Sequence, residues 1–136
     1  MIYLDSSVLL ELYLGAPRAA EARAVLDEPE SKVSSWLLMV EVPIVLRRAL
    51  PGPGQRAALA ACLERFDADV RDIGLVGSLS DVALRVRSDP RFARCRAPDA
   101  VHAATALLLR EWTGRSVRMA TFDARLAELA GDLHLD

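Results

Sequence analysis

The feature that most restricts the possible folds of this chain is the alternation of short apolar segments with longer segments of helical periodicity. Short runs rich in β-branched and aromatic residues favour strands, whereas apolar residues that repeat every three or four positions favour helices. Strands that alternate with helices are typical of a parallel sheet with helices packed on both faces. We expect strands at residues 2–5, 32–36, 70–73, 117–121 and 133–135.

Seven helices are expected between these strands, and several of their boundaries carry clear signals. Ser6 and Ser7 can cap the first helix, and Pro17 suits the first position of the second. The Pro-Gly-Pro-Gly run at 51–54 separates the third helix from the fourth, and Gly114 ends the sixth. The expected helices cover residues 6–14, 17–28, 37–50, 55–66, 78–88, 98–112 and 123–131.

Length and composition fit one compact domain. The chain has 136 residues, of which 52% are hydrophobic, and we expect a single domain over residues 1–136 with a three-layer α/β/α architecture. Its apolar runs are far shorter than the roughly 20 residues that a membrane span requires. Asp5 comes too early for a secretory signal, and the two cysteines have no metal-binding spacing. We therefore expect a cytoplasmic protein with no membrane association.

Four carboxylates stand in or beside apolar segments, where an unpaired charge is costly. Asp5 ends the first expected strand, and Asp123 follows the fourth. Glu41 lies about one turn into the helix after the second strand, and Asp99 begins the helix of residues 98–112. The carboxyl ends of parallel strands and the helix starts that follow them share one edge of the sheet, so all four acids can converge there.

Convergence of these acids predicts a bound cation. Like charges a few ångströms apart raise one another's pKa, and each helix N-terminus offsets only about 0.3–1 kcal/mol of that repulsion. Oxygen ligands without clustered histidine or cysteine favour Mg²⁺ or Mn²⁺ over zinc. An open site of this kind commonly activates water and neutralises the charge that develops on a phosphoryl group.

Four segments together resemble the successive motifs of PIN-domain ribonucleases, specifically the VapC-type toxins of bacterial toxin–antitoxin pairs. They are MIYLDSS at the N-terminus, VEV at 40–42, PDAVHAATAL at 98–107 and ATFDARLAELA at 120–130. They occur in the family's order and with family-like spacing over essentially the entire chain. The resemblance implies a parallel five-stranded sheet of order 3-2-1-4-5 and an endoribonuclease that depends on Mg²⁺ or Mn²⁺. It also implies a homodimer and a cognate antitoxin that blocks the site.

By the same resemblance, Asp5, Glu41, Asp99 and Asp123 form a catalytic, metal-binding quartet, and Thr121 supplies a hydroxyl group beside it. The implied mechanism is in-line attack of a metal-activated water on an RNA phosphodiester, which leaves 5′-phosphate and 3′-hydroxyl ends. Asp5 and Asp99 are the expected principal ligands, and the other two acids bind directly or through water. Cleavage of cellular RNA by such a toxin would inhibit translation and growth.

Three of the four acids also have a simple structural interpretation. Asp5 could only cap the first helix, while Asp99 and Asp123 lie in first helical turns, where acids favour the helix dipole. Glu41 has apolar neighbours and no obvious solvated face, but Pro43 could kink its helix and redirect its side chain.

Two further residues near the expected site have open roles. His102 shares a helical face with Asp99, and it could shuttle protons or make a structural hydrogen bond. Glu11, on the first expected helix, could approach the metal site or simply face solvent.

An arginine-rich stretch, RVRSDPRFARCR at 85–96, precedes Asp99. If it borders the acidic edge, Phe92 within it could stack on an unpaired RNA base. The alternative is a solvated helix end and loop without a ligand. In the first interpretation, salt-dependent contacts with the RNA backbone come from three side chains, Arg91, Arg94 and Arg96.

Other classes of function fit the sequence less well. A receiver-type phosphoacceptor domain also has an acidic edge, but it requires a lysine after the last strands, and the only lysine here is Lys32. A haloacid-dehalogenase-type phosphatase requires a DxD pair, which Asp5-Ser6-Ser7 lacks. A catalytically silent PIN-like module for RNA binding or protein interaction would have a broken quartet, whereas all four acids are present here.

Overall fold

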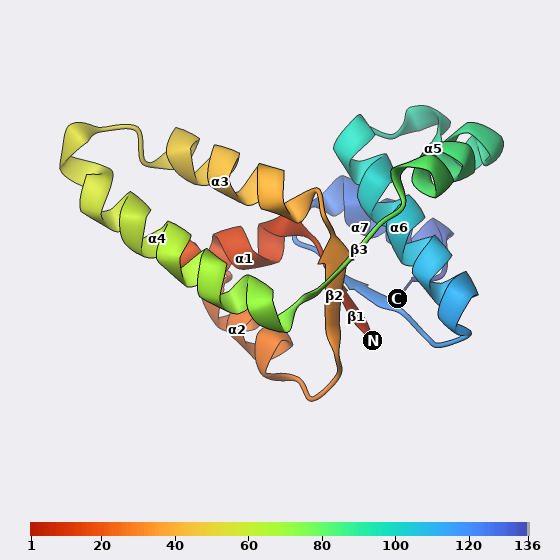
Figure 1. Ribbon diagram of the computed structural model, residues 1–136, viewed down its shortest axis with the longest axis horizontal. Coiled ribbons are helices and arrows are strands. Elements are labelled where there is room, and N and C mark those ends of the chain that lie inside the picture. The colour runs from red at the N-terminus through yellow and green to blue at the C-terminus, as the bar shows by residue number, and fades with distance from the viewer. Residues whose placement is uncertain (136) are drawn as a thin grey trace.

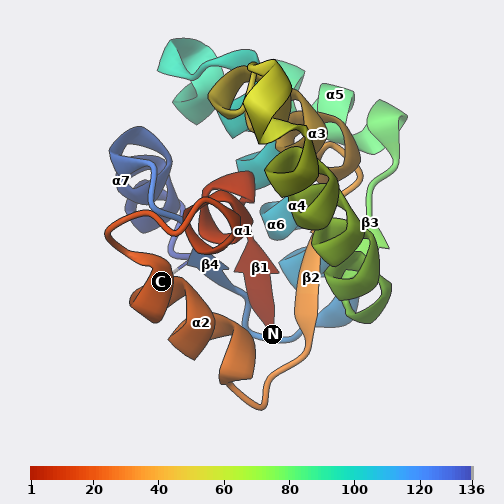
Figure 2. The same cartoon turned by 90° about the vertical axis from the view of Figure 1, so that its left-hand side faces the viewer.

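The structure is a computed structural model that describes residues 1–135, and its centre is a parallel sheet. The strands are β1 (Ile2–Leu4), β2 (Lys32–Ser35), β3 (Gly74–Val76) and β4 (Arg118–Ala120), in the order β3-β2-β1-β4. Tyr3 lies opposite Val33 on one side and opposite Met119 on the other. The parallel α/β fold expected from the alternating pattern is confirmed, with β1 in the interior of the sheet (Figure 2).

Within residues 1–135, seven α-helices cover the two faces of this sheet (Figure 1). The first four in the chain pack on one face and the last three on the other, so the molecule has three layers (Figures 1 and 2). Their ends agree with the expected ranges to within about three residues. The helices are α1 (Ser6–Tyr13), α2 (Ala19–Asp27), α3 (Leu38–Ala49), α4 (Arg56–Asp69), α5 (Leu79–Ser88), α6 (Ala97–Thr113) and α7 (Ala124–Asp132).

Side chains of β1 alternate between two hydrophobic cores. Ile2 and Leu4 are buried with residues of α1, α3 and α4, whereas Tyr3 is buried on the opposite face with α6 and α7. Successive side chains of a strand point to opposite faces, so a central strand that is apolar throughout fills both cores. This places the end of β1, and with it Asp5, between two packed layers.

The sheet differs from the expected one in two places. Residues 70–73 do not form the third strand: Val70–Asp72 is a 3₁₀ turn that continues α4, and β3 begins at Gly74. The expected strand at 133–135 is also wrong, so the described chain has four strands rather than five. His134 has a left-handed φ of 54°, which is incompatible with a strand, although the Leu135 carbonyl still accepts a hydrogen bond from the Met119 N–H.

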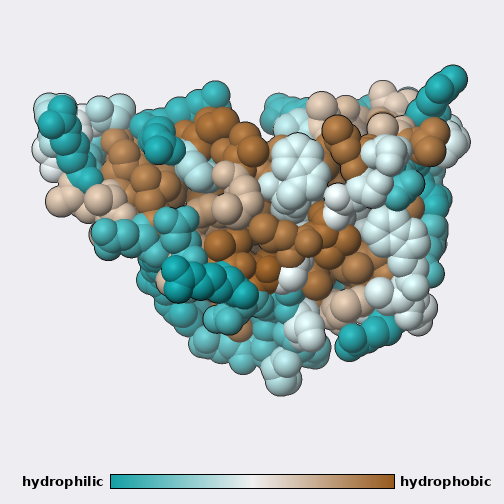
Figure 3. Space-filling view, in the orientation of Figure 1, coloured by the Kyte–Doolittle hydropathy of each residue, from teal (hydrophilic) through white to brown (hydrophobic). Residues whose placement is uncertain are grey.

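Large apolar side chains gather on the face that carries the β3 edge (Figure 3). Monomeric proteins rarely expose wide contiguous apolar patches. Within residues 1–135, no helix is both long and apolar enough to cross a membrane. The exposed apolar residues near this edge are Trp36, Met39, Val40, Ile44, Leu75, Leu79, Leu84 and Trp112.

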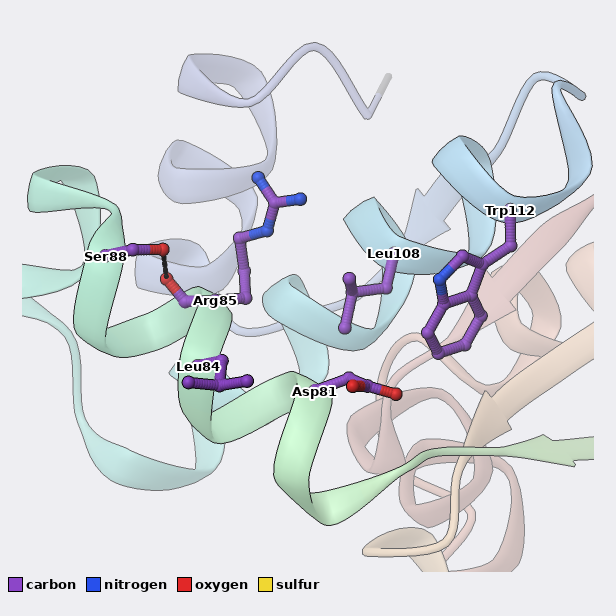
Figure 4. Close-up of a pocket in the computed structure, with 6 residues that line it drawn as sticks. All are labelled: Asp81, Leu84, Arg85, Ser88, Leu108 and Trp112. Atoms are coloured by element: carbon purple, nitrogen blue, oxygen red, sulfur yellow. Dashed lines mark hydrogen bonds between the residues drawn. The ribbon is translucent and has the colours of Figure 1, made fainter.

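A shallow hollow of about 340 Å³ lies between α5 and α6 on this part of the surface (Figure 4). Leu108 and Trp112 of α6 form one wall, and Leu84 and Arg85 of α5 form the other. Leu108 lies nine residues after Asp99, about 14 Å along the helix axis. The hollow is therefore well separated from the acidic edge.

Candidate active site

The local structure brings the four acids to the carboxyl edge of the sheet, as the topology predicts. Asp5 follows β1 and is the N-cap of α1, and Asp123 follows β4 and is the N-cap of α7. Glu41 and Asp99 lie in the first turns of α3 and α6. Pro43 is accommodated inside α3, so the helix continues past Glu41 to Ala49.

Asp5 is buried, and one of its two oxygens is fully occupied. Oδ2 accepts hydrogen bonds from the Ser7 hydroxyl at 2.6 Å, the Ser7 backbone N–H at 3.2 Å and the Thr121 hydroxyl at 2.9 Å. These three donors fix the orientation of the carboxylate. The other oxygen, Oδ1, accepts none of these three hydrogen bonds and lies near the His102 imidazole.

His102 connects this carboxylate to Glu41. Its Nε2 lies 2.7 Å from Glu41 Oε2 and 3.6 Å from Asp5 Oδ1, and its Nδ1 lies 2.9 Å from the Tyr3 hydroxyl. An ionised carboxylate can only accept a hydrogen bond, so Nε2 carries the proton and Nδ1 accepts from Tyr3. Both Tyr3 and His102 are buried, and their rings meet edge to face.

Asp5, Glu41 and His102 form the tightest group of possible metal ligands among the described residues. One ligand atom from each lies within 4.8 Å of the others. The sequence assigned His102 two roles, and the structure places its imidazole in hydrogen-bond contact with Glu41 rather than merely near the acids. The signal for this was its position three residues after Asp99, which puts both on one face of α6.

Asp99 lies outside that group of three, but the negative charges of Asp5 and Glu41 still act on its carboxyl group. Burial is the main cause that raises the pKa of Asp99, and the negative charge of Asp123 raises it further. Arg96 lowers it, and Asp5 and Glu41 add smaller upward contributions. The carboxyl group of Asp99 is therefore in an environment that favours either a proton or a cation.

Asp123 has a clear structural role in the same region. Its Oδ1 accepts hydrogen bonds from the backbone N–H groups of Arg125 at 2.8 Å and Leu126 at 3.2 Å, which caps α7. The Thr121 hydroxyl, besides donating to Asp5, accepts the Asp123 N–H at 3.1 Å. Thr121 thus ties Asp5 to the start of the α7 segment.

Three other residues singled out by the sequence lie elsewhere or are already paired. Glu11 accepts the backbone N–H of Arg18 at 3.0 Å and so stabilises the connection between α1 and α2. Phe92 is buried in the core against α6, so the predicted stacking on an RNA base is wrong. The Arg91 guanidinium donates three hydrogen bonds to the Asp89 carboxylate, at 2.9, 3.2 and 2.6 Å.

Comparison with known proteins identifies the family. The sequence model of the PIN-domain family matches residues 2–132 of this chain. The chain belongs to the PIN-domain family. It is also 33% identical to Ribonuclease VapC46 of Mycobacterium tuberculosis (strain ATCC 25618 / H37Rv) over 137 aligned positions, which cover 97% of this chain and 92% of that protein. These matches confirm the resemblance to VapC-type PIN domains that the four motifs indicate.

Proposed function

We propose that this PIN-domain protein is a metal-dependent endoribonuclease that acts as the toxin of a toxin–antitoxin pair. The observation that carries the proposal is the convergence of Asp5, Glu41 and His102 at the carboxyl edge of the sheet, with Asp99 and Asp123 in the same field. Similarity to a protein named as a ribonuclease supports the reaction class. The strain of holding several acids together is relieved by a divalent cation.

The donor groups fit Mg²⁺ or Mn²⁺. With Asp5 Oδ2 occupied by three hydrogen bonds, its Oδ1 is left as the ligand atom, and Glu41 retains Oε1 while Oε2 accepts from His102. Carboxylate oxygens in an open site suit a hard cation that keeps part of its water shell. We propose Asp5 and Asp99 as principal ligands, and Glu41 and Asp123 as direct or water-mediated ligands.

The protein's own contribution to catalysis is to fix the acids in place. When bound, Mg²⁺ or Mn²⁺ supplies activation of water and neutralisation of the charge on the phosphoryl oxygens. His102, with its proton on Nε2, orients Glu41, and Tyr3 fixes the tautomer through Nδ1. Ser7 and Thr121 hold Asp5 at a constant orientation, so little reorganisation is needed when RNA binds.

For partners we propose a homodimer and a cognate antitoxin in the cytoplasm, on the strength of the family resemblance. The exposed apolar side chains near the β3 edge support association with other protein chains in general. Light scattering of the purified chain, alone and with the product of a neighbouring reading frame, measures both associations. A chain that stays monomeric and binds no such product contradicts this part of the proposal.

Cleavage of RNA tests the catalytic assignment. Parent protein should cut structured RNA with Mg²⁺ or Mn²⁺ but not with chelator, leaving 5′-phosphate and 3′-hydroxyl ends. Asp5→Asn and Asp99→Asn should abolish cutting, whereas Asp67→Asn, an exposed acid on α4, should leave the rate unchanged. Circular dichroism checks that each variant is folded. Cutting by both site variants at the parent rate, or RNA binding without any cutting by the parent, would refute the proposal.

A further inference from the structure

A second cavity, of about 420 Å³, opens directly beside the acidic edge. Asp99 lines it, and its other walls come from the segment before α6 and from one side of α7. Pockets of this size accommodate small ligands such as a single nucleotide. Asp99 lines this cavity and is also one of the four acids, so a single ligand could extend from the cavity to the acidic edge.

Three guanidinium groups at this cavity are available for a ligand. Arg94, Arg96 and Arg125 line it, and within residues 1–135 none of them takes part in an ion pair. A fourth lining arginine, Arg91, is neutralised by Asp89 and so contributes less. Arg96 is close enough to Asp99 to lower the pKa of that carboxyl group.

The carboxylates that line the cavity do not cancel the positive charge of these three arginines once a cation is bound at the acidic edge. Besides Asp99, the lining contains Glu128 and Asp132. If Asp99 binds a cation as proposed above, the three unpaired arginines face only these two carboxylates. Guanidinium groups bind phosphate through paired hydrogen bonds, and three of them against two carboxylates leave the cavity a net positive charge that favours an anionic ligand.

We infer that this cavity is a subsite for the phosphodiester next to the one that is cut, with Arg94, Arg96 and Arg125 as its phosphate ligands. The inference rests on the proposed ribonuclease function and adds a binding site to it. Arg125 follows Asp123 by two residues at the start of α7, so the subsite is attached to the same helix start as one of the acids. It would hold the RNA strand in register while the neighbouring linkage is hydrolysed.

Binding can be separated from cutting by placing a neutral methylphosphonate at the mapped scissile linkage and keeping Mg²⁺ present, so that the acids retain their cation. We would titrate a short fluorescein-labelled single-stranded oligoribonucleotide by anisotropy at several KCl concentrations. Arg94→Gln, Arg96→Gln and Arg125→Gln should each weaken binding about ten-fold or more at low salt, and should each reduce the salt slope by about 0.7. Arg115→Gln is the matched control, since this exposed arginine precedes the amino end of β4, away from the site.

A chemical cycle then tests the position of the subsite. Once the parent's cleavage site is mapped, the linkage on either side is replaced by a neutral methylphosphonate. With the neutral linkage on one side, Arg125→Gln should cause no further loss of affinity, because its partner charge is already gone. Additive losses on both sides, or pocket variants that bind like Arg115→Gln, would overturn the inference even if the parent cuts RNA. Failure of the parent to cut RNA would instead refute the proposed function.

Discussion

Replacement of Tyr3 by phenylalanine should destabilise the fold by removing one buried hydrogen bond, the one to His102 Nδ1. Tyr3 is fully buried, and burial raises the pKa of its phenol well above the usual value, so the hydroxyl stays protonated and donates to His102 Nδ1 at 2.9 Å. Phenylalanine fills the same space without creating a cavity. In Tyr3→Phe the acceptor Nδ1 is left buried, and its other nitrogen is already engaged with Glu41.

Leaving a buried acceptor unsatisfied costs about 1–3 kcal/mol. The entropy of unfolding is about 2.1 cal/mol/K per residue, so for 136 residues this loss lowers the midpoint of thermal unfolding by roughly 3–10 °C. Urea denaturation of metal-free protein measures the free energy directly. Because His102 orients Glu41, the variant should also lose activity without losing its secondary structure.

Tyr13→Phe is the matched control. The Tyr13 hydroxyl also donates to a single partner, Asp69 Oδ2 at 3.0 Å, but that site is only partly buried. Water can replace the lost donor there, so the free energy of unfolding should fall by only about 0.5–1.5 kcal/mol. If Tyr3→Phe is no less stable than Tyr13→Phe, the hydrogen-bond chain from Tyr3 through His102 to Glu41 does not have the role derived for it.

Three further predictions concern the acids and their supports. Ser7→Ala removes a donor to Asp5 and the acceptor of the Phe122 N–H, so urea denaturation should give a loss of about 1–3 kcal/mol; an unchanged midpoint contradicts this. The raised pKa of Asp99 means that its charge destabilises the metal-free fold above that pKa, so Asp99→Asn should be more stable than the parent at pH 7. This gain in stability should disappear below about pH 3.8, where the parent carboxyl group is protonated in both the folded and the unfolded state. A gain that persists in acid would show that the charge of Asp99 is not its cause. Mg²⁺ or Mn²⁺ should raise the unfolding temperature of the parent but not of Asp5→Asn; equal shifts would place the ion elsewhere.

Much of the fold was predictable because its signals are local. The seven helices follow from periodicity and caps, and the parallel sheet follows from the alternation of elements. The third strand was misplaced because the apolar residues Val70 and Ile73 fit a strand, but the chain continues from α4 into a 3₁₀ turn before pairing at Gly74. That pairing depends on β2, a partner about 40 residues away in the sequence, and the strand propensity of the local residues gives no information about such a partner.

The convergence of the four acids was predictable, but the hydrogen bonds that connect them to other residues were not. The edge shared by Asp5, Glu41, Asp99 and Asp123 follows from topology. The hydrogen bond between His102 and Tyr3 depends on how α6 packs against β1. The two residues are 99 positions apart in the sequence, so no local sequence pattern predicts that they meet. Likewise, the arginine-rich stretch gave no sign that Arg91 would be paired with Asp89 while Arg125, from another helix, would join its neighbours at one cavity.

The hydrogen bond between Thr121 and Asp5 joins residues that are 116 positions apart, and it has a consequence for biosynthesis. Synthesis proceeds from the N-terminus, so Asp5 and Glu41 leave the ribosome long before Thr121 and His102, the residues that hold them in place. A nascent chain that ends before Thr121 lacks the cap of α7 and one of the three donors to Asp5. The RNA cleavage proposed for this protein therefore becomes available only after Thr121 and the segment around it have been synthesised, which leaves time for a partner to bind the parts made earlier.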